Sequence, residues 1–208
     1  MSDPRFYLAS ASPRRLELLR GIGIEPIVVP SAIEEGALPG EGADELVQRL
    51  AEAKGRDVAR RLPPALPGIL IAADTEVVLD GVCLGKPKDA RQARVMLRRL
   101  RGRVHDVLTG VFLMRTDDGR SVCDLERSRV HFHDFDEPTL EAYVATGESA
   151  DKAGAYGLQG RGAELVQRIE GSWSNVVGLP IERLPTWLKS LAVDRPAPAG
   201  ERRRLPGS

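Results

Sequence analysis

Cysteine and aromatic residues are scarce in this 208-residue chain, and neither sign of charge dominates it. Its two cysteines, Cys83 and Cys123, exclude a disulfide framework, and their spacing matches no zinc site. The scarcity of cysteine favours a reduced, intracellular setting. Thirty basic residues balance thirty acidic ones, so no overall field draws the protein to nucleic acid or to an anionic membrane. Any anion that binds this chain must therefore be held by local geometry.

Long apolar runs are also missing from the sequence. No stretch approaches the ~20 apolar residues that a membrane span needs. The first residues, MSDPRFYLAS, lack the apolar core of a signal peptide. We therefore expect a cytoplasmic protein whose partners include neither membrane nor nucleic acid. Its length permits one large domain or two small lobes with a proper hydrophobic core.

Apolar periodicity predicts strands and helices as far as about residue 193. Strands are expected at 6–9, 26–30, 69–73, 104–115, 121–133 and 164–169. Helices are expected from Pro13, over 43–61, over 89–100, from Pro138 and over 180–191. Continuously apolar and alternating strands occur together, which predicts an α/β fold with a mixed sheet of undetermined strand order. We expect one domain over 1–193 and a disordered tail over 194–208, where apolar periodicity ends.

The segment LASASPRRLELL (residues 8–19) places two cations at the start of a predicted helix. Ser12 is the expected N-cap and Pro13 the first helical residue. Arg14 and Arg15 then lie at the positive end of the helix dipole, where cations are unfavourable unless something negative binds there. Ser10 and the arginines, beside free backbone N–H groups, are typical of a phosphate site. From this stretch alone, a surface helix with solvated arginines is an equal alternative.

Asp74 and Thr75 stand where the apolar run 69–73 ends. A carboxylate in this position is typical of sites in α/β folds, and it can bind a divalent metal or act as a general base on water. Asp-Thr also forms turn caps, but the chain continues here as a strand, which favours a functional role. The loop pair Glu34 and Glu35 suits Mg²⁺ or Mn²⁺, although it is equally ordinary as surface charge.

Two lysines and a glycine-rich segment complete the unusual polar residues. Lys54 lies among small residues of a helix, and the proline after Lys86 gives that lysine a defined direction. Each is weak evidence alone, because most lysines only increase solubility. In DKAGAYGLQG (151–160), Gln159 offers a donor and an acceptor to a base edge. These groups suit a nucleotide polyphosphate. Hydrolysis is a simpler expectation than group transfer, because the sequence has no Walker loop and no obvious acceptor site.

The chain resembles the Maf family of nucleoside triphosphate pyrophosphatases in blocks that follow the family's order. The blocks are LASASPRRLELL, LAEAKG, AADTEVV, LGKP, HDVLTGV, EAYVATGESADKAGAYGLQG and GSWSNVVGLP, and they span residues 7 to about 190. The resemblance implies an elongated mixed β-sheet flanked by helices, with two lobes and a central cleft, as in Maf and ITPase-like proteins. It implies hydrolysis of a nucleoside triphosphate to the monophosphate and pyrophosphate, with Mg²⁺, Mn²⁺ or Co²⁺. We expect a homodimer.

The resemblance also implies roles for individual residues. Asp74 falls on the catalytic acid/base position, and Glu35 and Asp74 fall in the metal region. The residues expected to bind substrate are Ser10, Arg14, Arg15, Lys54, Thr75, Lys86 and Gln159. Three of them, Arg14, Thr75 and Gln159, match the branch that acts on dTTP and UTP rather than the branch that acts on 7-methyl-GTP. Modified pyrimidine nucleotides are further candidate substrates.

Two positions depart from the family's usual residues. Trp173 stands where tyrosine is common, which puts any hydrogen bond from that position in doubt, and Gly55 stands where alanine is usual, from which we expect little effect. The family is also associated with inhibition of septum formation. A nucleotide-binding regulator of cell division without significant turnover is therefore the alternative to an enzyme.

Overall fold

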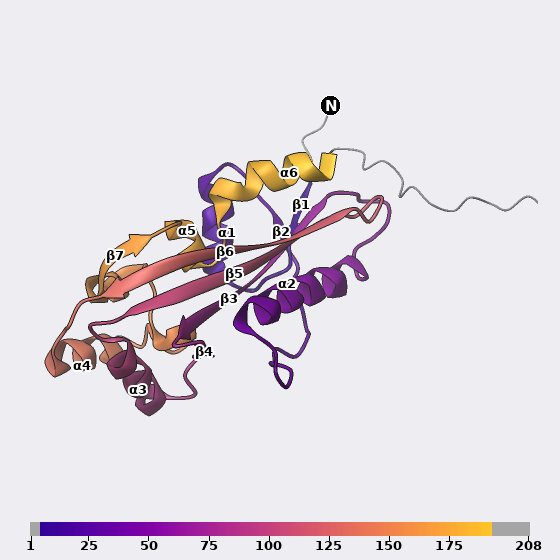
Figure 1. Cartoon of the computed structure of the whole chain (residues 1–208). Helices are drawn as coiled ribbons and strands as arrows, with labels where there is room; N and C mark the ends of the chain where they lie inside the picture. The colour runs from indigo at the N-terminus through magenta and orange to yellow at the C-terminus, as the bar shows by residue number, and fades with distance from the viewer. Residues whose placement is uncertain (1–4, 193–208) are drawn as a thin grey trace, which may run out of the picture.

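A computed structural model describes residues 5–192, in which helices flank a seven-stranded mixed sheet (Figure 1). The strand order is β2-β1-β3-β5-β6-β7, with β4 paired to β3 outside this path. The strands are β1 (Phe6–Leu8), β2 (Ile27–Val28), β3 (Ile69–Leu79), β4 (Val82–Cys83), β5 (Val104–Arg115), β6 (Ser121–Phe132) and β7 (Val166–Glu170). β1 pairs in parallel with β2 and β3, and the other pairs are antiparallel. The predicted α/β fold with an elongated mixed sheet is confirmed.

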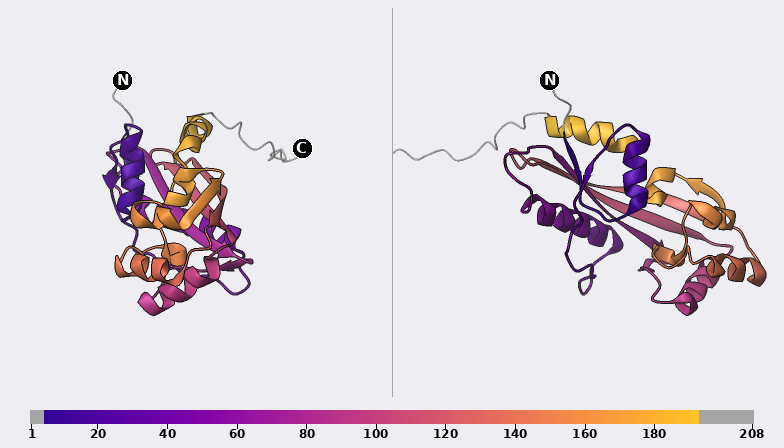
Figure 2. Two further views of the ribbon diagram at one scale, coloured as in Figure 1. Left: turned by 90° about the vertical axis from the view of Figure 1, so that its left-hand side faces the viewer. Right: turned by 180° about the vertical axis from the view of Figure 1, so that it is seen from behind.

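The two faces of the sheet carry different helices (Figures 1 and 2). On one face α2 (Ala43–Ala59) covers Leu70 and Ala72 of β3, and on the other α1 (Pro13–Gly21) and α6 (Leu184–Ala192) cover Ile71 and Ala73. The apolar run at the start of β3 is continuous because alternate side chains enter two separate cores. A third core, at the far end of β3, packs against α3 (Ala90–Leu100) and α4 (Glu137–Ala145).

The apolar run 69–73 is only the first part of this strand, and the chain continues as a strand beyond Asp74, as expected. β3 runs on to Leu79, so Asp74 lies in the middle of a strand rather than at its end. The strand continues because Val77 and Leu79 enter the third core. Asp80 and Gly81, with φ of 53° and 77°, then form the tight hairpin turn into β4 that Asp-Gly favours.

Helix α2 approaches the sheet closely at two glycines. A Cβ at Gly110 would lie 2.2 Å from the carbonyl oxygen of Val47, and one at Gly55 would lie 2.3 Å from Cδ1 of Phe112. An alanine at position 55 would therefore force the Phe112 ring to move, so the expectation that Gly55 has little effect is wrong. This close approach holds Lys54 of α2 against the sheet.

Other predicted boundaries hold to within a few residues. α3 follows Asp89, whose carboxylate caps the helix by accepting a hydrogen bond from the Gln92 amide at 2.7 Å. Ser12 is the N-cap residue of α1 but makes no side-chain capping bond. α5 (Trp173–Val177) and β4 were not predicted, and α6 begins only at Leu184. The tail expected over 194–208 lies outside the described residues, and within 5–192 no helix is both long and apolar enough to cross a membrane.

Candidate active site

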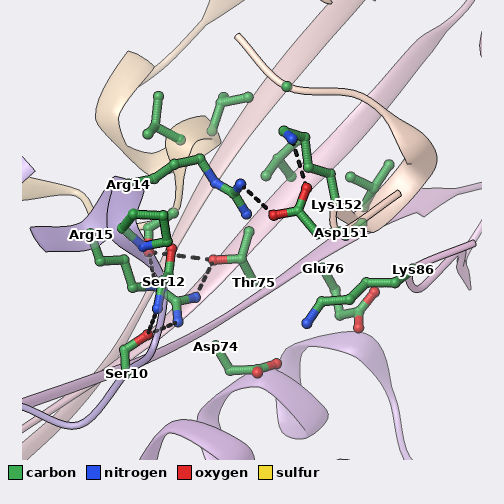
Figure 3. A pocket seen from close by; sticks show the side chains of 18 of the residues that line it. Ser10, Ser12, Arg14, Arg15, Asp74, Thr75, Glu76, Lys86, Asp151 and Lys152 are labelled. Carbon is green, nitrogen blue, oxygen red and sulfur yellow. Dashed lines mark hydrogen bonds and ion pairs between the residues drawn. The ribbon is translucent and has the colours of Figure 1, made fainter. Parts of the chain in front are cut away.

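A cavity of about 340 Å³ lies between the start of α1, the middle of β3 and the glycine-rich segment (Figure 3). This volume is in the range of small-molecule sites, roughly 300–1,000 Å³. The cavity is lined by every residue that the sequence predicted for the site: Ser10, Arg14, Arg15, Glu35, Lys54, Asp74, Thr75, Lys86 and Gln159. The structure thus brings them together, while their individual roles stay predictions.

Arg15 is fixed at one wall of the cavity by three hydrogen bonds. Its Nε donates to the Gly178 carbonyl at 2.8 Å, Nη1 donates to Ser10 Oγ at 3.1 Å and Nη2 donates to Thr75 Oγ1 at 3.1 Å. Burial lowers the pKa of Arg15, and the nearby carboxylate of Asp74 opposes this shift. The guanidinium is therefore a preorganised cation of the cavity and not a solvated surface group.

Arg14 is paired with an aspartate that sequence reasoning missed. Its Nη1 lies 3.0 Å from Oδ2 of Asp151, at the start of the glycine-rich segment, and Asp151 also accepts from Nζ of Lys152 at 2.7 Å. Burial raises the pKa of Asp151, but the bonds from Lys152 and Arg14 outweigh it and lower the pKa to about 2. This pair connects α1 to the glycine-rich segment across the cavity, as Figure 3 shows. The Asp-Lys pair that opens DKAGAYGLQG was the signal available in the sequence.

Lys54 lies between two carboxylates on the α2 side of the cavity. Its Nζ is 2.6 Å from Oδ1 of Asp74 and 2.9 Å from Oε1 of Glu35. Lys54 and Asp74 are 6% and 5% exposed, so each charge offsets the cost of burying the other. Burial raises the pKa of Glu35, but the bond to Lys54 and the positive charges around it bring the pKa below its ordinary value.

Glu76 is a further cavity carboxylate that sequence reasoning missed. It follows Asp74 by two residues on β3, so both side chains lie on the same face of the strand. Its Oε2 accepts a hydrogen bond from the Gly85 amide at 3.3 Å, in the segment that carries Lys86. Burial and, second, the charge of Asp74 raise the pKa of Glu76 to about 7. The alternation in AADTEVV was the signal that could have identified it.

Two further side-chain contacts anchor the glycine-rich segment. Nε2 of Gln159 lies 3.3 Å from Oε2 of Glu17 on α1. The hydroxyl of Tyr156 lies 2.7 Å from Nε2 of His105 on β5. Burial lowers the pKa of His105 to about 4, so the ring is neutral at pH 7. The segment is therefore a structured wall and not a linker.

The chain matches a family of known proteins. The profile of the family described as Maf-like protein matches residues 5–191. The chain belongs to the Maf family.

Several similar proteins are named dTTP/UTP pyrophosphatase. The dTTP/UTP pyrophosphatase of Dictyoglomus thermophilum is 45% identical over 185 residues, which cover 88% of this chain and 94% of the relative. The dTTP/UTP pyrophosphatase of Symbiobacterium thermophilum is 49% identical over 179 residues, which cover 86% of this chain and 90% of the relative. That of Acetivibrio thermocellus is 46% identical over 193 residues, which cover 91% of this chain and 96% of the relative. A crystal structure of a nucleoside-triphosphatase (dITP/XTP pyrophosphatase) from Mycobacterium abscessus matches 90% of this chain and 96% of that chain, at 16% identity and a TM-score of 0.44, which is too weak a likeness to carry function.

The acidic residues of the Maf site fit a divalent metal that arrives with its substrate. Glu35, Asp74 and Glu76 offer carboxylate oxygens to the cavity, the hard donors that Mg²⁺ and Mn²⁺ prefer. Among residues 5–192, no three histidine, cysteine or acidic side chains are grouped closely enough to hold a metal by themselves. Magnesium is commonly bound by one or two carboxylates together with substrate phosphates. The donor set therefore fits a metal whose remaining ligands come from a nucleotide.

Trp173, where the Maf family commonly has tyrosine, lies outside the cavity lining. It is the first residue of α5 and is 48% exposed. The helix is capped without it, because Ser172 Oγ accepts from the Asn175 amide at 2.9 Å. The cavity wall from this region is formed by residues 176–178. The change to tryptophan therefore leaves the described site untouched.

Proposed function

We propose that this Maf family protein is a dTTP/UTP pyrophosphatase, which hydrolyses these nucleotides to the nucleoside monophosphate and pyrophosphate. One observation carries the proposal: a single cavity contains two arginines, three lysines, four carboxylates and an amide on a structured segment. Cations suit a polyphosphate, carboxylates suit water activation and a metal, and an amide suits a base edge. The names of the relatives, at 45–49% identity, support the same substrates.

Several cationic side chains of the cavity hold the triphosphate. Arg15 and Ser10 form a preorganised donor pair at the start of α1, where the helix dipole also favours an anion. Lys86 extends from the opposite wall (Figure 3). Arg14 has further N–H donors beside the one that binds Asp151, and these can bind the phosphates.

Asp74 is the residue that we assign to water activation. Its carboxylate accepts a proton from a water molecule as the water oxygen forms a bond to the α-phosphorus. The bond from the α-phosphorus to the bridging oxygen breaks, and pyrophosphate leaves with that oxygen. The ammonium of Lys54, 2.6 Å from Asp74, holds the carboxylate in one orientation. Glu35 and Asp74, with Glu76 nearby, would hold the divalent metal. A bound divalent metal supplies neutralisation of the charge that develops on the phosphates.

We assign recognition of the base edge to Gln159. One amide hydrogen is directed to Glu17, and the other is free to donate to a pyrimidine carbonyl. Uracil and thymine share this carbonyl edge, and modified pyrimidines that keep it are further candidate substrates. A cytoplasmic location and a homodimeric assembly stay predictions from the sequence, as does one domain over 1–193.

A pyrophosphate-release assay over a panel of nucleotides with Mg²⁺, Mn²⁺ or Co²⁺ tests the proposal. We expect rapid release from UTP and dTTP and slow release from GTP and 7-methyl-GTP. Saturable binding of UTP in calorimetry without pyrophosphate release would instead support the regulator of cell division.

A further inference from the structure

Thr75 carries a hydroxyl whose hydrogen-bond polarity is set by its neighbours. Its Oγ1 lies 3.1 Å from Nη2 of Arg15 and 2.9 Å from Oγ1 of Thr109. A guanidinium has donors only, so Thr75 accepts from Arg15. The direction of its proton therefore depends on Thr109.

Thr109 is fully buried on β5, directly opposite Thr75 in the antiparallel register. Its Oγ1 lies 3.1 Å from the backbone carbonyl oxygen of Asn175, which is also fully buried. A carbonyl can only accept, so Thr109 donates its single proton to Asn175. Thr109 must then accept from Thr75, because the reverse direction would withdraw the donor from a buried carbonyl at a cost in free energy.

A second acceptor inside the protein, the Gly178 carbonyl, gives the Thr75 hydroxyl the same polarity. The Gly178 carbonyl lies 3.5 Å from Thr75 Oγ1 and already accepts from Nε of Arg15 at 2.8 Å. With either partner the Thr75 proton points into the protein, so the cavity sees a lone pair. Ser10 has the opposite polarity, because its Oγ accepts from Arg15 at 3.1 Å and from the Ser12 amide at 3.2 Å, which leaves its proton free.

We propose that Thr75 accepts a hydrogen bond from the imide N3–H of uracil or thymine, and that Thr109 is the positioning residue that enforces this polarity. The inference rests on the proposed function and extends it to how the site reads the base. Phosphate oxygens are acceptors, which suit the free proton of Ser10 and not the lone pair of Thr75. Cytosine has an unprotonated N3 at this edge, so two acceptors would face each other. Because Thr75 can only accept a hydrogen bond from the base, it selects UTP and dTTP over CTP.

The test compares kcat/KM for UTP and CTP in Thr109→Val and Thr109→Ser. Valine has nearly the shape of threonine but cannot accept. The Thr75 proton then keeps only the long 3.5 Å contact to the Gly178 carbonyl, which already accepts from Arg15, so it can turn toward cytosine N3. The ratio of UTP to CTP should fall about tenfold in Thr109→Val, as the loss of one matched hydrogen bond implies. Thr109→Ser keeps the hydroxyl and should keep the ratio within about twofold.

A double-mutant cycle separates this role from a purely structural one. Thr75→Val, which leaves the bond from Thr109 to Asn175 in place, should also lower the ratio, and it tests the inference even where Thr109→Val does not fold. Adding Thr109→Val to Thr75→Val should change the ratio no further.

The inference is overturned if Thr109→Val and Thr109→Ser give equal ratios, or if Thr75→Val leaves the ratio as it was. If the substitutions changed only the ratio of kcat/KM for dTTP to that for 2′,3′-dideoxy-TTP, Thr75 would contact the sugar. That result would overturn the base assignment. Failure of wild-type protein to release pyrophosphate from UTP would instead refute the proposed function.

Discussion

At Asp74 a buried carboxylate lies 2.6 Å from a buried ammonium, that of Lys54. Asp74→Asn keeps the size of the side chain and one hydrogen-bond acceptor but loses the charge and the capacity to take a proton. We expect turnover of UTP to fall by at least ~10²-fold. The variant should remain folded and bind nucleotide. Pyrophosphate release and calorimetry on the same preparation measure both effects.

Asp106→Asn is a matched control for that variant. Asp106 also forms an ion pair, at 2.8 Å with Arg127, but its side chain is more exposed and lines no part of the nucleotide cavity. Exposed ion pairs contribute little, so this variant should retain near-normal turnover. Near-normal turnover in Asp74→Asn itself would move water activation to Glu35 or Glu76.

Gln159 provides a second prediction, on substrate choice. Wild-type protein should prefer UTP and dTTP over GTP and 7-methyl-GTP by well over about tenfold in kcat/KM, because unpaired polar groups in a site are costly. Gln159→Glu removes the N–H donor and places a carboxylate beside Glu17, which now lies 3.3 Å from the amide. Most activity on pyrimidine nucleotides should be lost, while chemistry that depends on Asp74 persists on any substrate that still binds. Kinetics over the same nucleotide panel measure the change.

Gln167→Glu, on the exposed side of β7, adds the same charge away from the cavity and should leave the preference unchanged. If Gln159→Glu keeps the wild-type preference for UTP, then Gln159 does not read the base. Substrate choice would in that case depend on Arg14 and Thr75 alone.

Among the elements, β3 shows what the sequence can and cannot predict. Its apolar start was predictable from Ile69–Ala73, because local periodicity reports burial on both faces. Its length was not, because Val77 and Leu79 are buried in a core formed mainly by residues that follow later in the chain, from α3, β5, β6, α4 and the glycine-rich segment. Similarly, the arginines of α1 were predictable as an unfavourable pattern at a helix start. The bonds of Arg15 to Thr75 and Gly178 depend on tertiary contacts that no local pattern encodes.

Strands β3 and β5 carry two titrating groups with opposite effects on stability. Burial and then the charge of Asp74 raise the pKa of Glu76 from 4.5 to about 7, so the folded state binds more protons in this range and stability falls as pH rises. Burial and then the charge of His131 lower the pKa of His105 from 6.5 to about 4, so the unfolded state binds more protons and stability rises with pH. Each contribution is on the order of 1–3 kcal/mol across its window. In the wild type the two slopes partly cancel.

Removing one group should therefore expose the slope of the other. Between pH 5 and 7, the free energy of unfolding of Glu76→Gln should rise with pH more steeply than that of the wild type. That of His105→Gln should rise less steeply or fall. Urea unfolding of metal-free protein at several pH values measures these slopes independently of any constant loss of stability. Parallel curves for all three proteins would show that neither group changes its pKa on folding.

At the scale of the whole molecule, the site depends on parts of the chain that lie far apart in sequence. The cavity is lined from the start of α1, from α2, from β3 and from residues 151–159 and 176–178. β3 itself contributes side chains to the cores on both faces and to the core at its far end. A disturbance in any of these cores should reach the same cavity. We therefore expect residues 1–193 to unfold as one cooperative unit.

The last prediction is that a chain ending at Val193 keeps both the cooperative transition and the activity. All residues that line the cavity precede this position, and α6, the last described helix, ends at Ala192 after placing Leu184, Trp187 and Leu191 in the core. The shortened chain should match the full chain in its urea midpoint and in kcat/KM for UTP.

A chain ending at Arg183 is the contrasting variant. It loses those three core side chains, each worth roughly 2–5 kcal/mol, and should unfold. Two separate transitions in the chain ending at 193, detected by circular dichroism and by fluorescence of Trp173 and Trp187, would contradict a single unit. Loss of activity at an unchanged midpoint would instead assign residues 194–208 a part in the reaction.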